Sequence, residues 1–144
     1  MSIAAQIKAR RENLGLNLKA VAATLAMDEA SYWDLEGHDD ELTDVADLSQ
    51  AMQLSHLLGV RLLTLLEEDY DYVVGGRISF QDLREMILRK IAEGKLKKEE
   101  LSWEIDEFLE EPKIAFEYPI LFLKLIALEV GFDWRAVIAN YEEA

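Results

Sequence analysis

The fold of the first half of the chain is decided by residues 16–37, Leu-Asn-Leu-Lys-Ala-Val-Ala-Ala-Thr-Leu-Ala-Met-Asp-Glu-Ala-Ser-Tyr-Trp-Asp-Leu-Glu-Gly. Asn17 is a residue type that caps helices, and apolar side chains recur at helical spacing over residues 18–26. Asp28 can cap a second helix over residues 29–36 in the same way. The stretch therefore predicts two short helices joined by a tight turn.

The rest of the chain continues this helical pattern, because strand-like alternation of apolar and polar residues is nearly absent. The further helices that we expect are residues 3–14, 44–58, 62–67, 80–92, 99–110, 120–130 and 134–141, with an acidic loop over residues 37–43. The helix at 120–130 is apolar on nearly every side, so we expect it at the centre of the core. Gly75-Gly76 indicates a connector. The sequence thus predicts an all-α protein with an N-terminal domain over residues 1–70 and a C-terminal domain over residues 77–144.

Composition excludes several classes of protein. The 144 residues contain no cysteine, which excludes a disulfide scaffold, a zinc finger and a thiol nucleophile. Residues 1–11 lack the pattern of a secretory signal and no apolar stretch could span a bilayer, so we expect a cytoplasmic protein without membrane contact. No nucleophile–base pair, phosphate loop or paired carboxylates indicate an enzyme, and no cofactor is expected. His38 lies beside acids, but we expect a solvated loop there rather than a metal site.

The charge of the chain is unevenly distributed. The net charge is −14, and residues 27–76 hold thirteen acidic residues against the single base Arg61. Residues 77–98 have the opposite balance, with seven bases against three acids. Binding along a phosphate backbone relies on Lys and Arg, so the acidic stretch favours a basic partner over DNA.

The two helices of residues 16–37 resemble the lambda-repressor-like (XRE) helix-turn-helix family. In that family a helix with a Leu-Ala-x-x-Leu pattern leads through a tight turn into a recognition helix that ends near Ile-Glu. Val21-Ala22 and Leu25 fill the first pattern, and Leu35-Glu36 fills the second. The two closing helices of the family are matched by Leu48, Leu54, Leu58-Gly59-Val60, Leu62 and Leu65-Leu66. The resemblance covers roughly residues 5–67 and implies a five-helix N-terminal half.

This chain departs from the family at the positions that would contact DNA. The resemblance implies a phosphate-binding Gln where Leu18 stands and a turn glycine where Ala26 stands. The recognition helix displays Glu29, Trp33 and Asp34 where the family displays Ser, Arg, Gln, Thr or Asn. Acids beside phosphates weaken binding, so the fold can be kept while the DNA function is lost or weak.

Two sets of side chains are candidates for binding. We expect Tyr32 in the core and Trp33 exposed, because the two lie about 100° apart around a helix. The candidates for binding a protein partner are Asp28, Glu29, Trp33, Asp34, Asp39, Asp40, Glu41 and Asp44. The candidates for binding nucleic acid are Arg10, Arg11, Lys19, Arg89, Lys90, Lys95, Lys97 and Lys98. With 29 acids present, we favour the interpretation that these bases pair with acids within the chain or across a dimer.

The second half of the chain resembles a diverged copy of the first. At an offset of 70 residues, residues 18–22 align with residues 88–92, and Trp33-Asp34-Leu35-Glu36 aligns with Trp103-Glu104-Ile105-Asp106. After two further residues, Leu58-Gly59-Val60 aligns with Val130-Gly131-Phe132. An offset near half the chain length is typical of a tandem duplication. Unrelated helices ended by glycine would look similar, so both interpretations stay open.

The sequence favours a non-enzymatic protein that acts by protein–protein binding. The expected form is an antitoxin or immunity-type protein that covers a basic toxin, because the chain is small, acidic and without a catalytic constellation. The alternative is an XRE-family regulator that still binds DNA, as a homodimer. In that case the affinity for DNA falls steeply with salt.

Overall fold

The computed structural model describes residues 2–142, and within them the protein is all-α, with one isolated antiparallel bridge between Asp47 and Pro119 in place of any strand. The first half contains α1 (Ile3–Asn13), α2 (Leu18–Thr24), α3 (Glu29–Gly37), α4 (Glu41–Asp44), α5 (Leu48–Leu57) and α6 (Leu62–Leu65). The second half contains α7 (Phe80–Ala92), α8 (Trp103–Glu110), α9 (Ile120–Val130), α10 (Trp134–Tyr141) and the 3₁₀ helices η1 (Lys98–Glu100) and η2 (Pro112–Glu117). In the described part of the chain, none of these helices combines the length and the apolar character needed to cross a bilayer.

Local capping explains why most helices begin where the sequence predicts. The Asn17 carboxamide accepts the Lys19 and Ala20 amides at the start of α2, and Asp28 accepts the Ser31 amide at the start of α3. Ser79 and Asp82 form the reciprocal capping box expected at α7. These contacts satisfy amide groups that have no partner within the helix.

The largest differences from the sequence prediction lie in the acidic loop and at the starts of α5 and α8. The acidic loop expected at 37–43 contains the short helix α4, and the helix expected from residue 44 begins at Leu48. Asp47 caps α5 through a capping box with Gln50, which explains why the helix begins after residue 47. The helix expected from residue 99 begins at Trp103, because residues 98–100 form the 3₁₀ helix η1.

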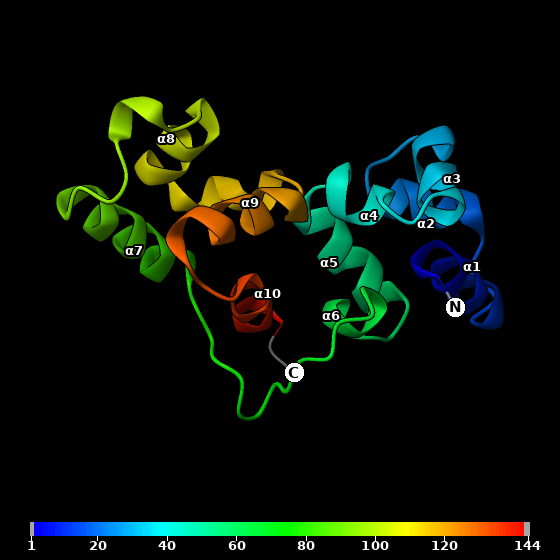
Figure 1. Cartoon of the computed structure of the whole chain (residues 1–144). Coiled ribbons are helices and arrows are strands. Elements are labelled where there is room, and N and C mark those ends of the chain that lie inside the picture. The colour runs from blue at the N-terminus through cyan, green and yellow to red at the C-terminus, as the bar shows by residue number, and fades with distance from the viewer. Residues whose placement is uncertain (1, 143–144) are drawn as a thin grey trace.

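The two halves share one apolar core. Buried side chains from α1 to α10 form a single contiguous cluster that crosses the midline of the chain. Figure 1 shows the halves side by side, with α9 against α4 and α10 against α6. The Glu142 carboxylate at the end of α10 accepts the Leu62 amide at 2.6 Å and the Tyr72 hydroxyl at 2.8 Å. The second half therefore helps to hold the N-terminus of α6 in place.

The prediction that the helix 120–130 lies at the centre of the core is wrong in part. Ile120, Leu123 and Ile126 of α9 are buried. Leu125 is 54% exposed and Leu128 is 84% exposed, so one face of this apolar helix lies at the surface. An apolar helix surface left open to water is unusual in a folded protein.

The elements of the two halves can be paired in chain order, although two α-helices of the first half are then paired with 3₁₀ helices of the second. From α1 to α6, the counterparts in order are α7, η1, α8, η2, α9 and α10. Asp47 and Pro119, which form the isolated bridge, are the N-cap residues of the counterparts α5 and α9. The contact of α4 with α9 is mirrored by that of η2 with α5. The contact of α1 with α3, by contrast, has no counterpart of similar extent between α7 and α8.

The positions of the helices agree with the later part of the alignment and differ from the earlier part, and the duplication stays a prediction. The glycines after α5 and α9, Gly59 and Gly131, have φ values of 68° and 82° and lie 72 residues apart, as aligned. Residues 88–92, however, are the last turns of α7 and not a counterpart of α2. Trp103 is the first residue of α8, whereas Trp33 lies in the middle of α3, so these two tryptophans are not equivalent.

Candidate protein-binding surface

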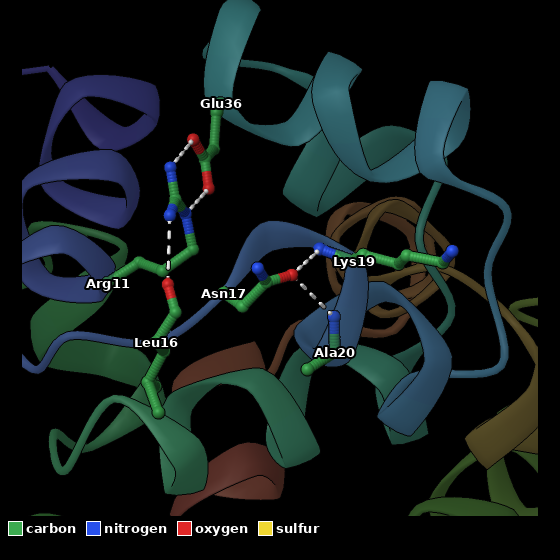
Figure 2. A network of polar contacts seen from close by, with 6 residues as sticks. All are labelled: Arg11, Leu16, Asn17, Lys19, Ala20 and Glu36. Carbon is green, nitrogen blue, oxygen red and sulfur yellow. Dashed lines mark hydrogen bonds and ion pairs between the residues drawn. The ribbon is translucent and has the colours of Figure 1, made fainter.

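The position of α3 on the first half is fixed by one nearly buried ion pair. Arg11 of α1 donates from Nε to Glu36 Oε2 at 2.5 Å and from Nη2 to Glu36 Oε1 at 3.0 Å. Its Nη1 donates to the Leu16 carbonyl at 3.0 Å, in the turn between α1 and α2, and Figure 2 shows all three contacts converging on the guanidinium. The Glu36 carboxylate raises the pKa of Arg11. Arg11, a candidate for binding nucleic acid, is thus engaged by its own chain.

With α3 held in this way, its side chains divide as the spacing predicts. Tyr32 is completely buried and Trp33 is 64% exposed, which confirms both expectations. The Tyr32 hydroxyl is buried without a hydrogen-bond partner, and burial together with the nearby Glu36 carboxylate raises its pKa. A neutral, enclosed phenol of this kind packs α3 against the core and leaves Trp33 to meet solvent.

Three of the predicted partner-binding acids line one cleft of about 380 Å³ between α3, α4 and α5. These are Asp28, Asp34 and Glu41, and Val45, 66% exposed, lies beside them. No Lys, Arg or His lines this acidic cleft. The Ser31 amide lowers the pKa of Asp28, which keeps that carboxylate charged. The acidic cleft therefore concentrates negative charge next to an apolar side chain.

The other predicted acids lie outside the acidic cleft. Glu29 and Asp40 are exposed, with Glu29 in the first turn of α3 and Asp40 just before α4. Asp44 accepts the Thr43 hydroxyl at 2.9 Å. Asp39 accepts the Ala4 amide at 3.0 Å, so its carboxylate caps α1 across the tertiary structure. Asp39 therefore stabilises the start of α1, and this carboxylate oxygen is already engaged within the chain.

The predicted nucleic-acid-binding bases do not gather at one place. Arg10 and Lys19 lie on α1 and α2, whereas Arg89 and Lys90 lie on the last turn of α7. Lys95 pairs with Glu93 at 3.5 Å, and Lys97 pairs with Glu100 at 4.0 Å. Lys98 is exposed at the start of η1. Within residues 2–142, no three side chains of the kinds that ligate metals converge, and Asp39 of the His38 segment is turned toward α1.

Sequence reasoning missed a second surface, the apolar groove between α8 and α9. Trp103, Leu125 and Leu128 line it and are all exposed. The signal was present in the sequence, since α9 is too apolar for a helix with one side in water. The prediction placed the whole of this helix in the core instead. Tyr118 lines the same groove, and burial together with the Glu107 carboxylate raises its pKa to about 12.

No protein-family model, no curated protein and no solved structure matches the chain.

Proposed function

We propose that the protein is a non-enzymatic binding protein of the antitoxin or immunity type, which neutralises a basic protein partner in the cytoplasm. The observation that carries the proposal is the acidic cleft, where Asp28, Asp34 and Glu41 converge without a lining base. These residues come from two helices, so their convergence is a property of the tertiary fold and not of a charge run alone. We also propose that the first half has the helix-turn-helix fold of the XRE family, which its sequence resembles.

The mechanism would be occlusion. Negative charge gathered in a cleft attracts Lys and Arg on the partner and accelerates association. Val45 beside the acids supplies apolar area at the centre of the contact. Trp33, 64% exposed, lies outside the cleft, in a depression lined by Lys8, Arg11, Glu36 and Gly37, and would be a second, aromatic anchor on α3. A partner seated there would have its basic surface covered and withheld from its target.

The experiment that tests this proposal is a pull-down with the full chain from host lysate at moderate salt, with and without nuclease. The wild type is compared with D28N/D34N/E41Q, which removes three charges from the acidic cleft. Asn at position 28 keeps a side-chain oxygen that can cap α3. The matched control is E85Q/D106N/E110Q, which removes three charges from exposed residues of the second half.

The two proteins are then compared in binding kinetics with the recovered partner. We expect a basic protein that is retained after nuclease treatment, with an association rate reduced about tenfold or more by the cleft variant and little by the control. Equal effects of the two variants would show that only net charge matters and would refute the acidic cleft. Recovery of a defined DNA fragment that nuclease removes would support the alternative function, a DNA-binding regulator.

A further inference from the structure

The groove between α8 and α9 is a wide depression with a mostly apolar lining. Its volume is about 730 Å³, and its apolar wall includes Trp103, Leu121, Phe122, Leu125 and Leu128. Trp103 is 65% exposed and Leu128 is 84% exposed, so these side chains are open to water. Contiguous exposed apolar surface with a polar rim marks a binding site on a soluble protein. In Figure 1, α8 and α9 lie in the half away from the N-terminus, apart from α3.

The spacing of the apolar side chains along α9 fits a helix as the occupant. Leu121, Leu125 and Leu128 follow one another at intervals of four and three residues, so they form a ridge along one face. At 1.5 Å per residue, the ridge is about 10 Å long. A partner helix with anchors at i, i+3 or i+4, and i+7 repeats over the same length. Trp103 at the start of α8 supplies a flat aromatic wall on the opposite side.

The charged residues around the groove indicate the charge of the partner that it would bind. Glu100 and Glu104 lie on the α8 side and Glu129 lies on the α9 side, and no base lines the groove. Lys97 approaches Glu100 at 4.0 Å, but both side chains are largely exposed and such a pair is weak. Lys124 of α9 is engaged elsewhere, since its Nζ lies 4.8 Å from the centre of the Trp134 ring.

This acidic rim argues against a second copy of the chain as the occupant. A symmetric dimer through the groove would bring Glu104 and Glu129 of one chain toward the same acids of the other. Like charges placed opposite each other across an interface are unfavourable. A helix with Lys or Arg on both sides of an apolar stripe would instead meet acids on both sides of the groove.

We propose that the α8–α9 groove binds an amphipathic helix of a partner protein, with an apolar stripe against Leu121, Leu125 and Leu128 and basic residues against the acidic rim. The inference goes beyond the function proposed above, because it uses a different surface in the other half of the chain. It needs neither the acidic cleft nor a toxin.

The test uses three labelled peptides of equal length and the full chain. The first has leucines at i, i+3, i+7 and i+10 flanked by Lys, the second has the same leucines flanked by Glu, and the third has the first composition in scrambled order. Binding is measured by fluorescence anisotropy, and helix formation in the peptide by circular dichroism. The variants are L125A/L128A and, as a matched control, V73A/V74A, which truncates two exposed apolar residues of the connector.

We expect saturable one-to-one binding of the basic amphipathic peptide with a gain of helix. Its affinity should fall at least tenfold in L125A/L128A and stay within twofold in V73A/V74A, because anchor residues dominate such interfaces. The Glu-flanked and scrambled peptides should bind at least tenfold more weakly. Equal binding of all peptides, no binding of the basic peptide, or indifference to L125A/L128A would each overturn the proposal. Sedimentation showing a dimer that L125A/L128A dissociates would overturn it in favour of a second copy.

The D28N/D34N/E41Q variant separates the two proposals. Peptide binding that persists in this variant supports the groove, whatever the outcome of the pull-down. Peptide binding that is lost in this variant would show that the peptide binds at the acidic cleft, and the groove proposal would fail while the acidic cleft proposal stood.

Discussion

Loss of one partner of the Arg11–Glu36 pair should remove a substantial fraction of the free energy of unfolding of the protein. The side chains of Arg11 and Glu36 are only 13% and 5% exposed. Replacing Arg11 with Met leaves the Glu36 carboxylate nearly buried without its cation, which costs about 3–5 kcal/mol for a buried pair. A domain of this size has a free energy of unfolding of about 5–15 kcal/mol. We therefore expect R11M to lose at least about a fifth of the stability, and all of it at the unstable end of this range.

The measurement is urea unfolding followed by circular dichroism, with the midpoint and the slope fitted separately. The control is K97M, which breaks an ion pair whose side chains are 68% and 70% exposed and should cost less than about 1 kcal/mol. The double variant R11M/E36L should recover most of the loss, because an apolar pair of similar volume needs no compensation of charge. The reasoning is refuted if R11M costs no more than K97M, or if the double variant is less stable than R11M.

Three further predictions concern single residues. Ala26 has a φ of 56°, so A26G should raise the free energy of unfolding by about 0.5–1 kcal/mol by removing left-handed strain, whereas A23G within α2 should lower it by about 1 kcal/mol in the same urea assay. D39A should cost about 1 kcal/mol, because the Ala4 amide loses its cap, and hydrogen exchange at that amide should accelerate. The folded pKa of Tyr118 is about 12 against about 10 unfolded, so its contribution to stability is complete below pH 10 and is lost as the pH rises toward 12. Y118F should therefore reduce the fall in stability over that range, and an unchanged fall would exclude Tyr118 as a cause.

Local features of the sequence predicted most helices, and the start of α5 that the prediction missed has both a local cap and a long-range contact. Asn17, Asp28 and Ser79 act within three residues of themselves, so their roles follow from the sequence alone. The predicted start at residue 44 overlooks the Asp47–Gln50 pair, whose spacing is that of a capping box. The choice of Asp47 accompanies contacts with the second half, where the Leu48 amide donates to the Tyr118 carbonyl at 2.8 Å. No local pattern could reveal a partner 70 residues away.

The candidate sites were predicted where helical spacing decides and missed where tertiary packing decides. The opposite exposures of Tyr32 and Trp33 follow from the 100° step between neighbours on a helix. The convergence of Asp34 and Glu41 depends on α4, which forms in a stretch expected to be a loop. Arg11 has the positive charge needed to bind a phosphate, and only the structure shows that its guanidinium is already paired with Glu36.

The union of two helical halves in one polypeptide with a shared core has a consequence for how the surfaces of this protein change during evolution. In a symmetric dimer of identical chains, every substitution appears twice, so both faces must tolerate it. Here a substitution alters one half only, and the two halves already differ, with carboxylates around Asp34 in one and leucines around Leu128 in the other. Selection can therefore act on each face separately while the shared core keeps them in a fixed mutual orientation.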